Sequence, residues 1–271
     1  MRKLDRLGWA AGTTIQAYGV RIGLRTNRPE ALEQLTAILP PGWKLARGRT
    51  VERIFSLYVG GAGARAGQRT FHLAYADFDR IARSRELPDV VEALASELQL
   101  YVAEHAKRYV FIHAGVVGWR GHAIVIPGSS MSGKSTLVEA LVRAGAEYYS
   151  DEYAVLDAAG CVHPFPKLPQ RRDLETFRQT TFTVESVGGK IGTRPLPVGT
   201  VIISQYDPAA TWRPRALSAG RGILALMAHA VAGRHAPERV LPTLTQLAHR
   251  AVILKGSRGE AEQLVSALLQ A

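Results

Sequence analysis

Residues 128–135 constrain the fold of this chain more than any other part of the sequence. They are Gly-Ser-Ser-Met-Ser-Gly-Lys-Ser and fit the pattern G-x-x-x-x-G-K-[ST] at every fixed position. With average residue frequencies, a chance match in a chain of this size has a probability of roughly 1%. An apolar run at 123–126 precedes them, and a helical pattern over 136–141 follows. This order of strand, glycine-containing loop and helix predicts an α/β fold.

The composition of the loop predicts a phosphate-binding site. Glycines allow the backbone to curl so that successive N–H groups point at phosphate oxygens, and the positive end of the following helix strengthens the field. Lys134 is expected to reach the β- and γ-phosphates, and the Ser135 hydroxyl to bind magnesium, so the expected cofactors are ATP and Mg²⁺. The predicted nucleotide-binding residues are Gly128, Ser129, Ser130, Met131, Ser132, Gly133, Lys134, Ser135 and Thr136.

Two adjacent acidic residues, Asp151 and Glu152, follow this loop, and Asp151 lies 17 residues after Lys134. That distance accommodates one helix, a turn and a short edge strand. Beside a magnesium–triphosphate site, paired carboxylates suit one metal-directed group and one general base. Without the loop upstream, we would interpret both as solvated turn residues.

Three segments together resemble a known family of enzymes. The resemblance is to the C-terminal catalytic domain of HPr kinase/phosphorylase. It lies in residues 111–117 (Phe-Ile-His-Ala-Gly-Val-Val), in residues 128–135, which we call the phosphate loop, and in Ser150-Asp151-Glu152. They are more similar still to the HPr-kinase-related serine kinases, some of which phosphorylate ribosomally made peptides, including lasso precursor peptides. The resemblance is specific over residues 109–160, weaker toward the C-terminus and vague in the first hundred residues.

The resemblance implies an active-site role for His113, which lies 15 residues before Gly128, as in that family. Its neutral imidazole would orient an acidic residue or the substrate hydroxyl. Without the resemblance, a single histidine beside an apolar strand would be interpreted as a core residue. The same comparison by position makes Lys134 the phosphate residue and Ser135 the magnesium residue.

Asp151 and Glu152 fall on the family's paired aspartates, the second of which is the base in phosphorylation and the acid in the reverse reaction. Here the second residue is Glu, whose extra methylene still allows it to reach a hydroxyl but leaves the order of the two roles open. We assign Glu152 as the base and Asp151 as the magnesium partner. The predicted catalytic residues are Glu152, Asp151, His113 and Lys134, and the predicted metal ligands are Ser135 and Asp151.

The sequence departs from the family in two places. The glycine-rich segment that carries a metal-binding Glu there has no clear counterpart, so Glu175 and Glu185 are both candidates for a third carboxylate. The segment associated with dephosphorylation is not recognisable, so the sequence does not support a reverse, phosphorylase reaction. The loop 165–172 is basic and stiffened by prolines. It is expected either to hold a phosphate or an acidic substrate, or to be an exposed basic loop.

The chain is expected to divide near residue 108. Residues 1–108 predict a small α+β region suited to substrate recruitment, and residues 109–271 predict a P-loop kinase core of the HPr kinase C-terminal-domain type. In the first region the pattern predicts strands over 15–24, 54–59 and 70–75, and helices over 29–39 and 88–108. In the second it predicts strands over 109–112, 115–119, 122–126, 147–149, 153–156, 198–205 and 251–255, and helices over 134–144, 216–232, 237–249 and 259–269.

The amino-acid composition indicates which kinds of binding partner to expect. The net charge of +11 comes mostly from scattered arginines, without a dense basic run, so we interpret it as an arginine-rich surface and do not expect nucleic acid. Cys161 is the only cysteine and cannot form an intramolecular disulfide. No apolar run approaches the ~18–20 residues of a membrane span, and the basic N-terminus lacks the apolar core of a secretory signal. We therefore expect a cytoplasmic protein without membrane contact.

The expected function is transfer of the γ-phosphoryl group of ATP to a serine-type hydroxyl of a peptide or protein substrate. Two alternatives remain: a nucleotide-gated binding protein or NTPase, and a kinase of a small hydroxylated metabolite. Turnover of ATP without an acceptor would separate the first alternative from a kinase. The resemblance also leaves a ring or other homo-oligomer open.

Overall fold

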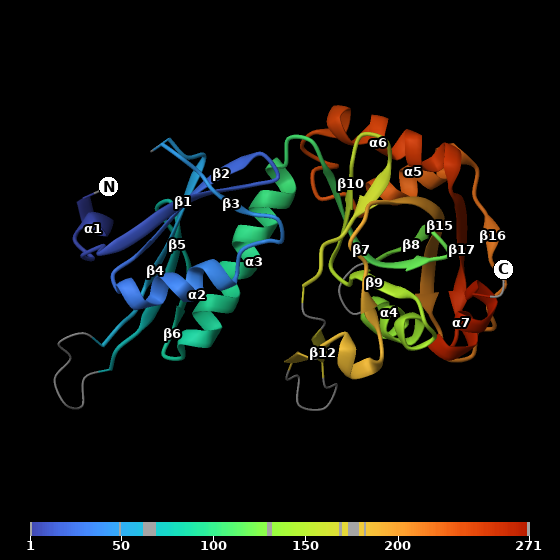
Figure 1. The fold of residues 1–271 in the computed structure, drawn as a ribbon, viewed down its shortest axis with the longest axis horizontal. Helices are drawn as coiled ribbons and strands as arrows, with labels where there is room; N and C mark the ends of the chain where they lie inside the picture. Colours follow the sequence, from blue (N-terminus) through green and yellow to red (C-terminus); the bar gives the residue numbers. More distant parts are fainter. Residues whose placement is uncertain are drawn as a thin grey trace. The chain divides into compact units, whose positions relative to one another are not determined.

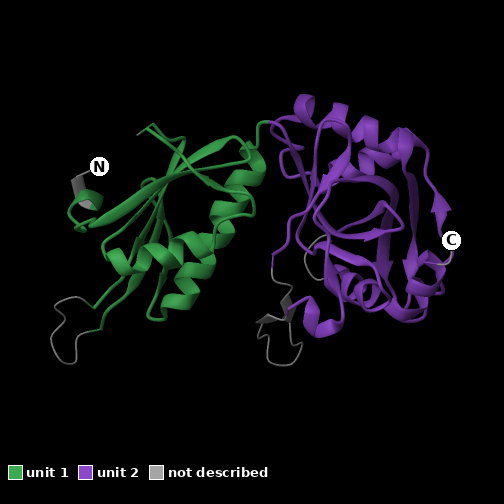
Figure 2. Cartoon of the chain, viewed as in Figure 1, with its two compact units in different colours: residues 1–107 green, residues 108–271 purple. Residues whose placement is uncertain are grey.

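The computed structural model describes residues 2–48, 50–61, 69–128, 132–167, 170–172, 179–181 and 183–269. The chain divides into two compact units, Met1–Lys107 and Arg108–Ala271 (Figure 2). This division lies one residue before the boundary expected from the sequence. Both units combine helices with strands, so the protein is a mixed α/β protein. Within the described ranges, every helix is too short or too polar to traverse a lipid bilayer.

The first unit contains a six-stranded sheet in the order β3-β1-β2-β4-β5-β6 (Figure 1). β2 and β4 run parallel, and the other neighbours run antiparallel. Alternate apolar residues of the strands pack against α2 and α3 in one core. The elements are α1 (Arg2–Asp5), β1 (Ala11–Ala17), β2 (Val20–Thr26), η1 (Pro29–Ala31), α2 (Leu32–Ala37), β3 (Lys44–Leu45), β4 (Arg53–Tyr58), β5 (His72–Ala76), β6 (Asp79–Ser84) and α3 (Leu87–His105).

A hairpin replaces the single strand expected over residues 15–24. β1 and β2 pair as far as Ala17 and Val20, so only Tyr18 and Gly19 connect them. Tyr18 and Gly19 have φ angles of 49° and 87°, and positive φ at both central residues is the geometry of a two-residue hairpin turn. The expectation of one strand was wrong: the buried apolar positions shift from odd numbers (Ile15, Ala17) to even numbers (Val20, Ile22) across the turn, and this change of phase marks two strands.

The second unit contains a nine-stranded mixed sheet. β8, β15 and β17 run parallel, whereas β7 runs antiparallel to β8, β9 and β10. The elements are β7 (Val110–Trp119), β8 (His122–Pro127), α4 (Lys134–Arg143), β9 (Glu147–Ser150), β10 (Tyr153–Leu156), β11 (Cys161–His163), β12 (Gln170–Arg172), β13 (Gln179–Thr181), η2 (Glu185–Val187), β14 (Lys190–Ile191), β15 (Leu196–Tyr206), β16 (Arg215–Ala216), α5 (Ala219–Met227), α6 (Pro237–Arg250), β17 (Val252–Arg258) and α7 (Ala261–Leu269).

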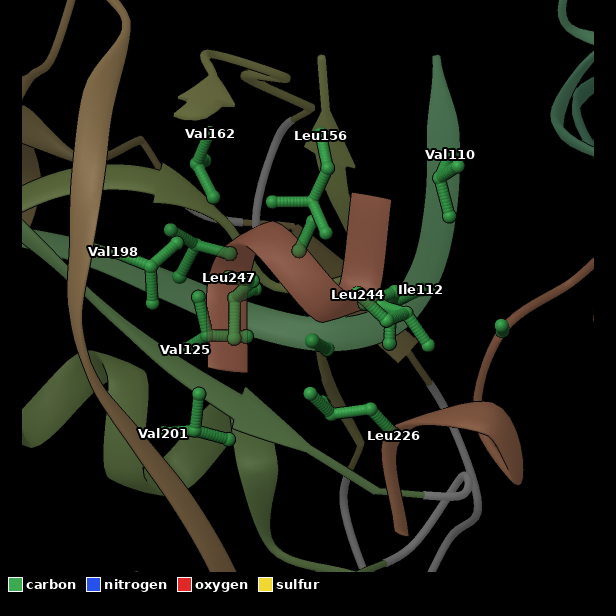
Figure 3. Packing of buried hydrophobic residues seen from close by; sticks show 14 of the residues in the cluster. Val110, Ile112, Val125, Leu156, Val162, Val198, Val201, Leu226, Leu244 and Leu247 are labelled. Atoms are coloured by element: carbon green, nitrogen blue, oxygen red, sulfur yellow. The ribbon is translucent and has the colours of Figure 1, made fainter. Parts of the chain in front are cut away.

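Helices cover both faces of this sheet (Figure 1). Successive strand residues point to opposite faces, so Val116 and Val125 pack with α5 and α6, while Val117 and Ile124 pack with α4 and α7. Figure 3 shows the core on the side of α5 and α6, where Leu226, Leu244 and Leu247 meet the strand residues. Strands buried on both sides account for the continuous apolar run of β8, which leads into the phosphate loop.

β7 is one continuous strand, where the sequence suggested two strands over 109–112 and 115–119. The apolar pattern is interrupted at His113, the exposed position inside the strand, where β7 passes from pairing with β10 to pairing with β8. The helix expected over 216–232 is shorter than predicted and covers only Ala219–Met227. Residues after it leave the helix because Ala230 forms a bridge with Ile112 of β7.

α4 lies close to β7 because position 115 is a glycine. A β-carbon on Gly115 would overlap Cγ2 of Val138 in α4 and would lie 3.9 Å from Cβ of Lys134. Both β7 and α4 are buried at this point, so neither element has room to move away. The start of α4 is thus held against the strand that carries His113.

Gly115→Ala is expected to destabilise the protein by about 1–3 kcal/mol, because the added methyl group overpacks the contact between β7 and α4. Gly220→Ala in α5 is the control: nothing lies within 4 Å of an added β-carbon there, and alanine favours helix, so stability should be unchanged or slightly higher. Urea unfolding measures both. Adding Val138→Ala to Gly115→Ala should relieve the overlap, so the two substitutions should not be additive. An unaltered unfolding midpoint for Gly115→Ala would contradict the close packing.

Candidate nucleotide site

The predicted site residues meet where the neighbours of β7 change. On one edge, β7 pairs with β10 as far as His113 opposite Tyr153, and the N–H of Ala114 donates to the carbonyl oxygen of Glu152 at 3.2 Å. On the other edge, the N–H of Gly128 donates to the carbonyl oxygen of His113, also at 3.2 Å. The carboxylate pair and the phosphate loop therefore begin beside the same two residues of β7.

The phosphate loop ends at the first turn of α4. Gly133 caps the helix with a φ of 79°, a conformation that glycine adopts without strain, and Lys134 is the first helical residue. Ser135 and Thr136 are exposed on the same turn. The free N–H groups and the dipole of this helix start suit an anion. The predicted binding residues Ser129, Ser130 and Met131 lie outside the described part of the chain.

Lys134 interacts electrostatically with both predicted catalytic carboxylates. Burial lowers the pKa of the Lys134 ammonium, and the negative charges of Asp151 and Glu152 partly oppose that change. Desolvation of this kind strengthens the attraction between a charge and its ligand, because less water screens them. The three side chains that the sequence placed in one site therefore interact with each other in the structure.

Asp151 and Glu152 lie in the tight turn between β9 and β10. The buried Ser150 Oγ accepts hydrogen bonds from the N–H groups of Glu152 at 3.1 Å and of Tyr153 at 3.0 Å. The side chain of Ser150 thus provides a hydrogen-bond acceptor for two backbone N–H groups in the turn, where the hydrogen bonds between strands are interrupted. This explains why a serine precedes the acidic pair, and it leaves both carboxylates half-buried at the end of the strands.

The basic loop 165–172 is joined to the carboxylates, which favours a site role over the alternative of an exposed basic loop. Nζ of Lys167 lies 2.5 Å from Oε2 of Glu152, and both side chains are 30% exposed. The Tyr148 hydroxyl lies 2.9 Å from the Lys167 carbonyl oxygen and 3.2 Å from Oδ1 of Asp151. Phe165 anchors the start of the loop in the core. Residues 168 and 169 and the side chains of 170–172 lie outside the described part.

Ser135 and Asp151, the predicted metal ligands, line one small pocket beside α4. A hydroxyl and a carboxylate fit Mg²⁺, which takes oxygen ligands and usually keeps waters and substrate phosphates in its remaining positions. Glu139, one turn along α4, lines the same pocket with an 11% exposed side chain that also binds Arg143. Among the described residues, no three or more His, Cys, Asp or Glu side chains form a ready-made metal cluster. The remaining lining residues are valines and Tyr148, so the oxygen atoms that line this pocket come from few side chains.

Neither candidate for a third metal-binding carboxylate is supported. Glu185 begins η2 and is exposed, and its side chain does not line the pocket, although Val184 and Val187 do. Glu175 lies outside the described residues. Glu139 is a further carboxylate at this pocket that sequence reasoning did not single out, and it is paired with Arg143. Its position four residues after Ser135, on the same face of a helix, was the available signal.

His113 lies in a row of three rings across adjacent segments. Tyr153 of β10 is directly opposite, and the two ring centroids are 4.8 Å apart. On the other edge, the N–H of His113 donates to the carbonyl oxygen of His229 at 2.9 Å, next to the bridge between Ile112 and Ala230. Residues directly opposite in antiparallel pairs share a face, so His229 lies on the face of β7 that carries His113. The sequence did not indicate His229.

Desolvation by the groups packed around each ring lowers the pKa of both histidines, although the side chain of His113 stays partly open to solvent and that of His229 is half-buried. Desolvation is the main cause at His113 and at His229, and the positive charge of Lys134 acts in the same direction on both. The charge of Glu152 partly opposes the change at His113. Since an ordinary histidine pKa is about 6.5, both imidazoles are neutral at pH 7. Each can therefore donate one hydrogen bond and accept another.

A comparison with models of known protein families gives no match, and a comparison with curated proteins gives none either. Any assignment of function therefore depends on the geometry of the described residues and on the sequence motif.

The free energy of unfolding is expected to fall as the pH decreases below 6.5, the ordinary histidine pKa. Because desolvation lowers the pKa of His113 and His229, the unfolded chain binds protons there that the folded chain does not bind, and acid favours unfolding. Urea denaturation over a pH series measures this slope. His113→Gln should reduce it, whereas the control His249→Gln, on the exposed side of α6, should not. Equal slopes in wild type and His113→Gln would contradict the desolvation of this ring by its neighbours in the site.

Proposed function

We propose that this protein is a kinase that transfers the γ-phosphoryl group of ATP to a serine-type hydroxyl of a peptide or protein. In this proposal residues 109–271 form a P-loop kinase core of the HPr kinase C-terminal-domain type, and the first unit recruits the substrate in the cytoplasm. The observation that carries the proposal is the pair of hydrogen bonds that joins the phosphate loop and the Glu152 turn to adjacent residues of β7. They bring a base, a lysine and a helix start to one site.

Each side chain has a task in such a reaction. Lys134 neutralises the β- and γ-phosphates, and the backbone N–H groups of the loop bind their oxygens. Ser135 and Asp151 would hold Mg²⁺, which would supply positive charge against the charge that develops on the phosphates. Glu152 accepts the proton of the acceptor hydroxyl as the P–O bond forms. Positioning and electrostatics supply most of the rate in phosphoryl transfer.

Two neighbouring groups position the base. Lys167 holds Glu152 through the ion pair, and it keeps the carboxylate oriented until an acceptor enters. His113 is neutral and lies next to Tyr153, so it can hydrogen-bond the acceptor hydroxyl without adding charge. A site of this kind suits an aliphatic hydroxyl, which is only partly deprotonated when it attacks.

An NTPase that gates a binding surface is the second candidate. A kinase of a small hydroxylated metabolite would use the same residues. Assays with peptide and metabolite acceptors, with ATP turnover in the absence of acceptor as the baseline, distinguish the three activities.

Substitutions should separate nucleotide binding from chemistry. Lys134→Ala and Ser135→Ala should weaken Mg-ATP binding in calorimetric titration, because the first removes phosphate neutralisation and the second a metal ligand. Glu152→Gln should bind Mg-ATP nearly normally yet lose ~10²–10⁴-fold in phosphoryl transfer. Asp151→Asn should raise the magnesium concentration required for activity.

The control for these variants is Glu147→Gln, an exposed carboxylate at the start of β9, which should leave binding and activity unchanged. Wild-type affinity and turnover in both Lys134→Ala and Ser135→Ala would contradict the phosphate-loop assignment. If Glu152→Gln stays active while Asp151→Asn is inactive, the two carboxylates exchange roles.

The product should be a phosphate monoester of an aliphatic hydroxyl. A carboxylate base within about 3 Å of the hydroxyl suits such an acceptor, whereas phosphohistidine and acyl phosphate formation need no such base. Incubation with labelled ATP and candidate peptides, followed by treatment with acid and alkali, measures the stability of the product. We expect a product that survives acid. An acid-labile, base-stable product would exclude the hydroxyl acceptor.

A further inference from the structure

Arg258 is the last residue of β17, and its side chain contacts the backbone of the phosphate loop. The residue is only 3% exposed. Its Nη2 donates to the carbonyl oxygen of Gly133 at 3.0 Å and lies 3.4 Å from that of Ser132. Its Nη1 donates to the carbonyl oxygen of Gly259 at 3.1 Å. One guanidinium group thus joins the end of a core strand to the last two residues before α4.

The geometry of these contacts suits a loop that binds phosphate. When a loop turns its N–H groups toward a phosphate, its carbonyl groups turn away and need hydrogen-bond donors of their own. The planar guanidinium of Arg258 offers several N–H groups in a fixed fork, which a lysine cannot reproduce. Gly133 leaves the space, because a β-carbon at that position would overlap Nη2 of Arg258. The second glycine of the motif therefore accommodates the arginine as well as the left-handed turn.

The positive charge of Arg258 is costly in this position. Burial lowers the pKa of the guanidinium, although the charge of Glu260 partly opposes this. Within the described part of the chain, its Nε has no hydrogen-bond partner, and neither has the buried Oγ of Ser132. The Tyr206 ring lies 5.4 Å from the guanidinium carbon, and its hydroxyl is 2.7 Å from Glu260. A buried cation is stabilised by a nearby anion, so bound phosphates would offset this cost.

We propose that Arg258 is a positioning residue for nucleotide binding. It fixes the carbonyl groups of Ser132 and Gly133, the two residues that lead into α4, and it adds a positive charge beside them. This inference rests on the proposed function only in that the loop binds Mg-ATP; it does not depend on the acceptor. If Arg258 only fastened β17 to the loop, its loss would lower stability and leave nucleotide affinity unchanged.

The test compares Arg258→Met, Arg258→Lys and the control Lys255→Met, an exposed residue of the same strand. Thermal unfolding without nucleotide and circular dichroism establish which variants fold. Calorimetric titration with Mg-ATP and Mg-ADP then measures affinity at a temperature where each variant is folded. We expect Arg258→Met to bind both nucleotides at least about tenfold more weakly, since it loses several charge-assisted hydrogen bonds. Arg258→Lys should show a smaller loss and Lys255→Met none.

Hydrogen exchange supplies a second readout. Amides in residues 132–137 should exchange faster in the Arg258 variants, whereas those of α6 should keep their wild-type rates. Wild-type affinity in a folded Arg258 variant, even with reduced stability, overturns the inference. If Arg258→Met does not fold, Arg258→Lys decides, since wild-type affinity and loop exchange in that variant would overturn the inference as well. Absence of Mg-ATP binding in the wild-type protein would instead refute the proposed function.

Discussion

Two backbone hydrogen bonds from adjacent residues of β7 organise the candidate site. The carbonyl oxygen of His113 accepts from Gly128, and the N–H of Ala114 donates to Glu152. Every backbone N–H and C=O group of a buried strand needs a hydrogen-bond partner. Where β7 stops pairing with one strand and starts pairing with another, two other segments therefore have to supply the partners for His113 and Ala114. Those segments are the start of the phosphate loop and the carboxylate turn. Neither can move away without breaking a hydrogen bond in the core.

The charges around this point are arranged in compensating pairs. Lys134 interacts with Asp151 and Glu152, and Lys167 pairs with Glu152. The two histidines on the same face add no charge at neutral pH, because desolvation lowers the pKa of each. Arg258 adds one further positive charge beside the loop, which favours an anionic ligand.

Local patterns were sufficient for much of the fold. The helix expected over 134–144 is α4 (Lys134–Arg143), which has helical apolar periodicity, and the strand over 153–156 matches β10, which is a short, fully apolar run. The hairpin at Tyr18 and Gly19 was missed because the shift of the alternation by one position between Ala17 and Val20 is small beside the apolar residues on either side. His229 and Arg258 were missed for a different reason. Each reaches the site through irregular backbone or a strand end, and no local pattern indicates which distant segment it will meet.

The sequence by itself determined that a strand, a glycine-containing loop and a helix follow one another at 123–141, and that an acidic pair lies one short element further on. Those features depend on residue type and spacing, which determine the local structure of the backbone. The tertiary structure decided which groups surround them. Lys167 binds Glu152, Glu139 lines the pocket of Ser135 and Asp151, and Arg258 supports Gly133. These contacts join residues that the sheet order brings together, and sheet order is set by the packing of the whole core rather than by any single segment.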